Sequence, residues 1–373
     1  MIAEGIRIIE VKTQKELDDF IKFPYFLYSD NLFYIPPLIR EMKKKFCRTK
    51  NPFFKHADVR FFLAFKNGKT AGRITSIINY KHIEFHNEKA GFFGFFESIN
   101  DQKVAFALFD TVSESLKNAG MKIMRGPMSF STNDECGLLI EGFETYPMIM
   151  TSYNPTYYRE IIETYGMEKA KDLFSYIIDI PDKLPEKIER AAEIATKRGI
   201  HVRPINIKKF DEDMEKFRTV YNSAWEKNWG FIPLTDEELT YLGNDLKPLL
   251  VPDITLIAEK GNEPVGFMGI LPDYNFVLKQ MKGRFNLISI MKGIYYSKKI
   301  KDLRLLLLGI RTEFRQKGVD ALLFREGFKG AKKRGYKRAE FSWILEDNIP
   351  VQKLVEMIKG RLYKKYRIYE KIL

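Results

Sequence analysis

One stretch of the sequence, Leu303–Leu323, combines a strand of buried character, a basic turn and the start of a helix. The first turn of a helix has backbone N–H groups without intrahelical partners and a partial positive charge, which together bind phosphate. Gly318 would let the backbone approach an anion closely. The stretch therefore predicts an anion-binding loop, and the alternative is a solvated turn without a ligand. The loop residues are Arg315, Gln316, Lys317, Gly318 and Val319.

Four carboxylates are candidates for a general base. Glu346 and Asp347 come where the strand after this helix should end, and Glu226 lies between Trp225 and Trp229. Burial in such an aromatic segment would raise the pKa of Glu226 towards that of a useful base. For each of these three, the alternative is a solvated or structural carboxylate.

The fourth carboxylate, Asp273, lies in Leu271-Pro-Asp-Tyr-Asn275. Asp273 and Asn275 could contact a substrate, or they could form a turn. Trp225 and Trp229 could line an apolar ligand pocket, and the alternative for both is core packing. Tyr363 is a candidate general acid that could instead pack against a sheet.

The composition limits the classes of partner. The 373 residues include 62 Lys and Arg against 49 Asp and Glu, so the net charge is +13. This excess favours a polyanionic partner such as a phosphorylated cofactor, nucleic acid or an anionic membrane surface. The sequence has no helix-turn-helix, RNA-binding signature or zinc finger, so we expect no nucleic acid. Two cysteines are too few for a disulfide framework. Because the sequence has only four histidines, we also expect no metal.

The sequence also allows a prediction of the cellular location. It contains no apolar run of the roughly 18–20 residues that a membrane-spanning helix needs. The first ten residues lack the basic start and apolar stretch of a signal peptide. We therefore expect a cytoplasmic protein, with peripheral association at the inner membrane face as a further expectation.

A repeat organises the chain. Residues of the first half recur 194 positions later, and both halves contain a β-hairpin pattern around a polar turn. The register changes in between, which indicates compensating insertions around residues 126–147 and 271–301. We expect tandem α/β domains, each a mixed twisted sheet flanked by helices, at residues 1–180 and 199–373, with a helical linker at 181–198. The matching residues are Gly5 and Gly199, Ala64 and Ala258, Gly72 and Gly266, Asn154 and Asn348, and Gly166 and Gly360.

With these surroundings, Arg315-Gln-Lys-Gly-Val-Asp320 resembles the pyrophosphate loop of the GCN5-related N-acetyltransferase (GNAT) superfamily, written Arg/Gln-x-x-Gly-x-Gly/Ala. Asp320 departs from the pattern, since a carboxylate would repel a pyrophosphate. Asn348 resembles the family's Asn after the fifth strand, and Val355 stands where a Tyr often acts as general acid. The resemblance implies acyl-CoA as co-substrate, held by the loop and by the strand backbone around Leu308 and Ile310.

The first half lacks the loop. Its corresponding segment, Ser98-Ile-Asn-Asp-Gln-Lys-Val, has no Arg-x-x-Gly and predicts a poor pyrophosphate site. We therefore expect acyl-CoA to bind the second half, while the first half is structural or shapes the acceptor site.

Residues 126–139, 222–234 and 366–371 resemble the bacterial ceramide synthase-like family in a narrower way. This resemblance implies an N-acyltransferase that moves an acyl group from a thioester to a primary amine of the long-chain, sphingoid type. Transfer would be direct, with Glu346, Glu226, Asn348 and Tyr363 as candidate catalytic residues. The alternative is a catalytically inactive tandem GNAT-fold protein that binds a small molecule or lipid.

The insertion at residues 278–301 has seven basic residues and no acidic one, interleaved with apolar and aromatic side chains. Such a segment suits an anionic bilayer surface. The alternative is a helix that packs its apolar face onto the sheet and leaves its lysines in water. The basic residues are Lys279, Lys282, Arg284, Lys292, Lys298, Lys299 and Lys301.

Overall fold

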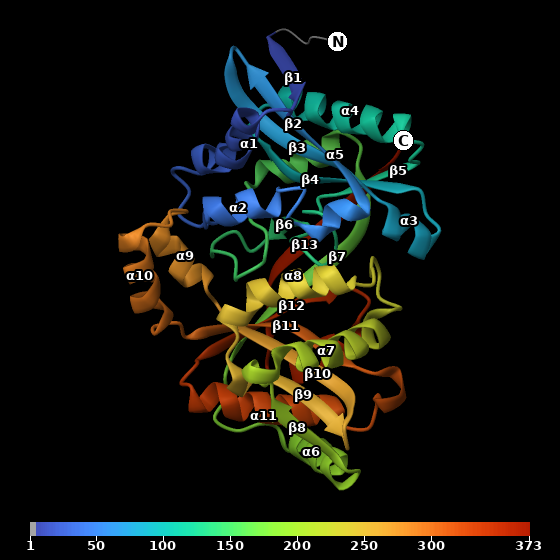
Figure 1. Cartoon of the computed structure of the whole chain (residues 1–373), viewed down its shortest axis with the longest axis vertical. Coiled ribbons are helices and arrows are strands. Elements are labelled where there is room, and N and C mark those ends of the chain that lie inside the picture. Colours follow the sequence, from blue (N-terminus) through green and yellow to red (C-terminus); the bar gives the residue numbers. More distant parts are fainter. Residues whose placement is uncertain (1–4) are drawn as a thin grey trace. The chain divides into compact units, whose positions relative to one another are not determined.

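The computed structural model describes residues 5–373, so the first four residues of the segment examined for a signal peptide lie outside it. The chain forms two compact units (Figure 1). Unit 1 comprises the residues up to Leu173, Leu278–Ile294 and Lys364–Leu373, and unit 2 comprises Phe174–Val277 and Tyr295–Tyr363. Among residues 5–373, no helix has the length and apolar character needed to cross a membrane.

The first half of the sequence forms a mixed sheet with flanking helices, as predicted. Its strands follow the order β1-β2-β3-β4-β5 in the sheet, with β5 next to the C-terminal strand β13. The elements are β1 (Ile6–Glu10), α1 (Gln14–Leu27), α2 (Ile39–Lys45), β2 (Ala57–Lys66), β3 (Lys69–Asn79), α3 (Tyr80–His86), β4 (Ala90–Ser98), α4 (Gln102–Asn118), β5 (Ile123–Gly126), β6 (Leu138–Glu141), α5 (Tyr157–Thr164) and β7 (Glu168–Asp179).

The second half repeats this order. Its sheet runs β12-β11-β10-β9-β8, with β7 beside β12. The elements are α6 (Glu186–Lys197), β8 (Ile200–Pro204), α7 (Phe210–Trp225), α8 (Asp236–Leu246), β9 (Thr255–Lys260), β10 (Glu263–Pro272), α9 (Asn275–Met281), α10 (Leu287–Ser297), β11 (Asp302–Ile310), α11 (Val319–Lys333), β12 (Arg338–Leu345), α12 (Ile349–Met357) and β13 (Arg361–Ile372). Short 3₁₀ turns lie at Pro52–Lys55, Ile207–Lys209, Lys247–Leu249, Pro252–Ile254 and Thr312–Phe314.

Both predicted hairpins are present in the register that the repeat implies. Ala64 of β2 lies opposite Gly72 of β3, and Ala258 of β9 lies opposite Gly266 of β10. The β2–β3 turn has its Asn and Gly in the left-handed region, which a two-residue hairpin turn requires. The repeat pattern therefore reflects one supersecondary unit that occurs twice.

The compact units differ from the two sequence halves at their closing strands. Lys364–Leu373, which contains most of β13, belongs to unit 1, where β13 pairs antiparallel with β5 and β6. Phe174–Asp179, the second part of β7, belongs to unit 2. Each unit thus takes its last strand from the other half of the sequence. The segment 181–198, predicted as a linker, contains α6 and is part of unit 2.

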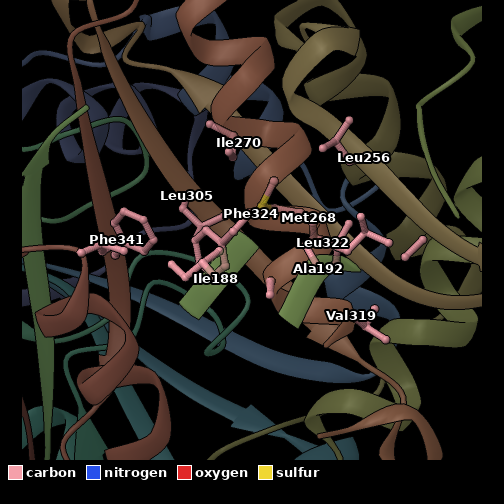
Figure 2. Packing of buried hydrophobic residues seen from close by; sticks show 14 of the residues in the cluster. Ile188, Ala192, Leu256, Met268, Ile270, Leu305, Val319, Leu322, Phe324 and Phe341 are labelled. Atoms are coloured by element: carbon pink, nitrogen blue, oxygen red, sulfur yellow. The ribbon is translucent and has the colours of Figure 1, made fainter. Parts of the chain in front are cut away.

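The core of unit 2 explains how α6 and α11 are held. Ile188 and Ala192 of α6 belong to the same buried cluster as Val319 and Leu322 of α11, and α11 covers Met268 of β10 (Figure 2). Ala192 and Val319 are fully buried, so the start of α11 is fixed by tight packing. This packing sets the position of the basic loop that precedes α11.

Candidate active site

The sheet of unit 2 opens between β11 and β12. Their parallel pairing covers Asp302–Leu305 opposite Arg338–Phe341 and ends there. On its other side β11 stays paired with β10 as far as Ile310, with a bulge at Leu306. A bulge bends its strand, and alternate backbone groups of residues 306–310 face away from β10. These backbone groups form an open strand edge, at the predicted positions Leu308 and Ile310.

The loop that follows this edge presents a row of backbone N–H groups. Gln316 and Gly318 have positive φ angles of 58° and 82°, which turn the chain sharply into α11. No acceptor is found among residues 5–373 for the backbone N–H groups of residues 316–321. The first backbone hydrogen bond of α11 is donated by Leu322 N to Gly318 O. No side chain caps this helix. Unsatisfied amides at a helix start form an anion-binding site.

The basic side chains of the loop have different surroundings. Arg315 donates to Ala224 O at 2.7 Å, at the C-terminal end of α7, so it also fastens the loop to that helix. Lys317 is exposed, and its Nζ lies 4.9 Å from the Phe314 ring centroid. Asp320 is half-buried in the first turn of α11, where the positive end of the helix dipole stabilises a carboxylate. Asp320 therefore has a structural explanation, although its charge still opposes an anion nearby.

Gly318 has a packing role that the sequence did not reveal. A Cβ at this position would lie 2.2 Å from Ala191 O of α6, and its φ is in the left-handed region. A side chain at residue 318 would displace α6 as well as disturb the loop. A charged substitution there would not leave the fold intact, so it cannot test anion binding.

Trp225 lies directly against the open strand. A Cβ at Gly309 of β11 would come within 2.2 Å of the Trp225 ring, so the absent side chain makes room for the indole. Trp225 also contacts Tyr221, with ring centroids 5.0 Å apart, and both belong to the apolar cluster between α7 and the sheet. This tryptophan forms an aromatic wall beside β11. Trp229 is half-buried in the turn between α7 and α8.

A buried polar network lies where β11 and β12 separate. Leu303 and Leu305 pack towards α11, so Arg304 between them points to the opposite face of the sheet. Arg304 is 2% exposed and Glu340 is 0% exposed, with Arg304 Nε 3.6 Å from Glu340 Oε1. Arg304 Nε also donates to Ser342 Oγ at 2.8 Å. Removing one partner of such a buried ion pair would leave the other charge uncompensated.

Tyr363 joins this network. Its hydroxyl donates to Glu340 Oε2, and Ser342 Oγ donates to Glu340 Oε1. Tyr363 is half-buried, so it is the member of the network that a ligand can reach. Sequence reasoning named Tyr363 and missed Arg304, Glu340 and Ser342. The available signal was a charged residue between apolar neighbours in each strand, Arg304 in β11 and Glu340 in β12.

The structure also describes the surroundings of the other predicted catalytic residues. Glu226 is exposed, so the predicted burial between the two tryptophans is wrong. Asn348 caps α12, accepting from Val351 N at 3.4 Å. Val355 is fully buried and packs against Gly360. Glu346 lies after β12, and its backbone carbonyl accepts from Gln352.

Asp273 and Asn275 form the turn that begins α9. The Asp273 carboxylate accepts from Asn275 N at 3.2 Å, and both residues are buried. This geometry matches the turn-forming alternative. A further candidate role for these residues in substrate binding stays a prediction.

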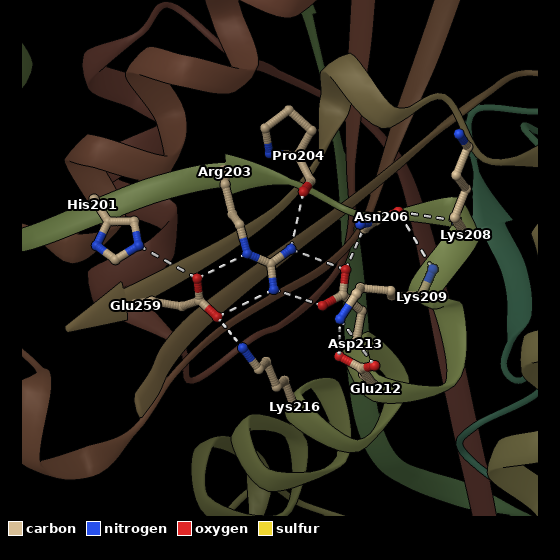
Figure 3. A network of polar contacts seen from close by, with 10 residues as sticks. All are labelled: His201, Arg203, Pro204, Asn206, Lys208, Lys209, Glu212, Asp213, Lys216 and Glu259. Atoms are coloured by element: carbon tan, nitrogen blue, oxygen red, sulfur yellow. Dashed lines mark hydrogen bonds and ion pairs between the residues drawn. The ribbon is translucent and has the colours of Figure 1, made fainter. Parts of the chain in front are cut away.

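A second polar network fixes α7 at the far edge of the same sheet (Figure 3). Arg203 of β8 donates to Asp213 of α7 at 2.6 Å and to Glu259 of β9 at 2.8 Å. Burial would raise the pKa of Asp213, but the hydrogen bonds from Arg203 outweigh it and the pKa is lowered. The depression beside this network, about 690 Å³, is lined by Lys208 and its neighbours and lies at β8, not at β11.

The corresponding loop of unit 1 is closed to anions. Asp101 caps α4 and accepts from Lys103 N at 3.0 Å and Val104 N at 3.3 Å, while Lys66 pairs with the same carboxylate. The N–H groups that are open in α11 are thus occupied by a protein carboxylate here. Beyond the β4–β5 pairing, Met128 N donates to Phe93 O at 2.8 Å, so the chain itself fills the gap between the strands.

Replacing Asp101 by Ala is expected to destabilise unit 1 without affecting CoA binding. Loss of an N-cap costs about 1 kcal/mol, and loss of the Lys66 pair adds little at a partly exposed site. Chemical denaturation with CoA titration of the same variant checks this. A large loss of CoA affinity would show that the ligand uses the unit 1 loop.

Unit 1 also holds a buried carboxyl group. Glu97 of β4 accepts from Tyr28 at 2.6 Å and from Tyr158 at 2.9 Å, and Arg73 lies 3.9 Å away. Burial raises the pKa of Glu97 to about 7, and the positive charge of Arg73 and the tyrosine hydrogen bonds only partly oppose this. The folded chain therefore binds the Glu97 proton more tightly than the unfolded chain does.

This proton linkage predicts a pH dependence of stability. The contribution of Glu97 is fully present below its unfolded pKa and is lost as pH rises through about 7. Glu97→Gln removes the linkage. The melting temperature of the variant minus that of the wild type should therefore increase by roughly 3–8 °C between pH 5 and pH 8. Parallel melting curves against pH for the two proteins would contradict this.

No group of three or more His, Cys, Asp or Glu side chains among residues 5–373 is arranged to hold a metal ion.

Comparison with known proteins identifies the class. A tandem GNAT protein from the clavulanic acid biosynthesis pathway aligns over 98% of both chains at a TM-score of 0.59 and 9% identity. A GCN5-related N-acetyltransferase from Sphaerobacter thermophilus covers 100% of this chain and 97% of that chain, at a TM-score of 0.55 and 12% identity. The protein thus has the tandem GNAT fold, as predicted.

The sequence relatives identify the family. The bacterial ceramide synthase of Caulobacter vibrioides is 32% identical over 99% of this chain and 98% of its own. Protein YghO of Escherichia coli is 34% identical over 96% of this chain and 93% of its own. The chain therefore belongs to the bacterial ceramide synthase family, which confirms the predicted N-acyltransferase family. A scan against protein-family models finds no match.

Proposed function

We propose that this protein transfers an acyl group from acyl-CoA to the primary amine of a long-chain, sphingoid-type acceptor. The observation that carries the proposal is the open edge of β11, which leads into the uncapped start of α11. A pantetheine arm can pair with the strand edge while a pyrophosphate accepts from residues 316–321. Together these two groups place the thioester where β11 and β12 separate.

The long-chain acceptor is supported by two observations. A full-length relative at 32% identity is named bacterial ceramide synthase. In addition, the half-buried Trp225 ring, supported from behind by buried Tyr221, presents an apolar aromatic surface beside β11, which suits a hydrocarbon chain better than a polar acceptor.

The chemistry needs a group that removes a proton from the amine. An alkyl ammonium has a pKa of about 10 and must lose a proton before attack. We assign this to Tyr363: its oxygen takes the proton while its own proton passes to Glu340. The neutral amine attacks, the C–N bond forms and the C–S bond breaks. The attacking nitrogen gives its second proton to water, and CoA leaves as a thiolate that takes up the proton held on Glu340, returned through Tyr363. Arg304 and Ser342 hold Glu340 in position.

The test is incubation of the purified protein with a panel of amines and labelled acyl-CoA donors of different chain lengths, followed by mass spectrometry. The proposal predicts an amide product with long-chain amines and acyl-CoA. CoA binding without any amide product would instead support a tandem GNAT-fold protein that has lost its chemistry, which the departures at Asp320 and Val355 favour.

A further inference from the structure

Helix α10 turns its apolar side outward. Within this helix only Ser289 is buried, and Ser289, Gly293 and Ser297 lie four residues apart on the same face. The opposite face is apolar and exposed, and the exposed fractions of its residues lie between 37% and 74%. The exposed residues are Leu287, Ile288, Ile290, Met291, Ile294 and Tyr295. A helix that packs by its small residues and exposes its large apolar ones contradicts the alternative of an apolar face packed on the sheet.

The start of this segment is anchored, so the exposed face has a defined position. Ile39 N donates to Gly283 O at 3.2 Å, and a Cβ at Gly283 would lie 2.4 Å from the Tyr25 ring. The Lys279 ammonium lies 5.0 Å from the Tyr146 ring centroid. All of these contacts lie within unit 1. The apolar face is therefore displayed on a packed segment and does not belong to a loose loop.

The charge around this face selects the partner. Residues 278–301 contain seven Lys and Arg and no Asp or Glu. Lys292 lies within α10 and is exposed, and Lys299 Nζ donates a hydrogen bond to Tyr295 Oη at 2.5 Å. A basic border around an apolar, aromatic helix face complements a surface that is negatively charged outside and apolar beneath. An anionic lipid bilayer has this arrangement, and long lysines can reach its headgroups while apolar side chains enter it.

We propose that α10 binds the surface of an anionic membrane, with Leu287, Met291 and Ile294 inserted among the lipid chains. The helix lies parallel to the bilayer plane and does not cross it, since it has only 11 residues. This surface is separate from the transfer chemistry and would hold the protein where long-chain lipids are found.

Co-sedimentation with lipid vesicles tests the proposal. The full chain is mixed with vesicles of phosphatidylcholine containing about one third phosphatidylglycerol, or with pure phosphatidylcholine. The wild type should sediment with the anionic vesicles and much less with the neutral ones. Met291→Ser/Ile294→Ser should lower the partition coefficient for anionic vesicles by about tenfold or more, since two inserted apolar side chains are lost.

The matched control is Ile194→Ser/Ile207→Ser, which changes two exposed isoleucines outside α10 and should sediment like the wild type. Equal sedimentation of the α10 variant, or a wild type that stays in the supernatant with both vesicles, would overturn the proposal. So would a dimer in sedimentation velocity that the α10 variant converts to monomer, because a second copy would then cover the face. CoA affinity, measured without vesicles, reports the transfer site separately.

Discussion

Tyr363→Phe is expected to lower kcat for amide formation by roughly 10²–10⁴-fold, the usual contribution of a positioned acid or base. The change removes only the hydroxyl that donates to Glu340, and it leaves the ring in place. CoA affinity should stay within about threefold of wild type, because the loop before α11 is untouched. Steady-state kinetics with a long-chain amine, combined with CoA titration, measures both quantities.

A matched control is Tyr336→Phe, which removes the hydroxyl of another half-buried tyrosine of unit 2. This variant should retain kcat. If Tyr363→Phe keeps more than half of the wild-type rate while the melting temperature is unchanged, the proton passes through another group. Glu346, near the end of β12, would then be the next candidate.

The second large effect concerns the anion site. Lys317→Glu should weaken CoA binding by roughly 10–100-fold, because a positive charge beside the open N–H groups becomes negative. Lys317 is exposed and has no ion pair among the described residues, so the fold should tolerate the change. Isothermal titration at low ionic strength measures the affinity, and added salt should reduce the difference between variant and wild type.

Lys208→Glu is the control, since it makes the same charge change at an exposed lysine near β8, beside a different depression. Its CoA affinity should change by less than about threefold, as expected for a distant surface charge. If both variants bind CoA equally well, the phosphates lie elsewhere. If both lose affinity equally, the ligand responds to net charge and not to the loop.

The fold was predictable because local patterns repeat. The hairpins around Gly72 and Gly266 and the helix after Gly318 follow from turn residues and periodicity, which depend only on neighbours in the chain. The exchange of β7 and β13 between the units was not predictable. The partners of β7 and β13 in each unit are decided by packing between residues far apart in the sequence. Because both strands carry similar alternating patterns, the sequence does not show which strand closes which unit.

The site was only half predictable for the same reason. The loop Arg315–Val319 is a local motif, so the sequence identified it. Arg304 and Glu340 are 36 positions apart and meet only because β11 and β12 are parallel neighbours. The wrong prediction that Glu226 is buried has a related cause: Trp225 and Trp229 are half-buried, while position 226 caps the end of α7 and is exposed.

Hydrogen exchange with and without CoA tests the central claim most directly, because it reports on the individual N–H groups proposed to bind the ligand. The account predicts slower exchange in a peptide covering residues 306–321 when CoA is added, with no change in the peptide around Asp101. Protection confined to the Asp101 segment, or no protection in either peptide at saturating CoA, would contradict it.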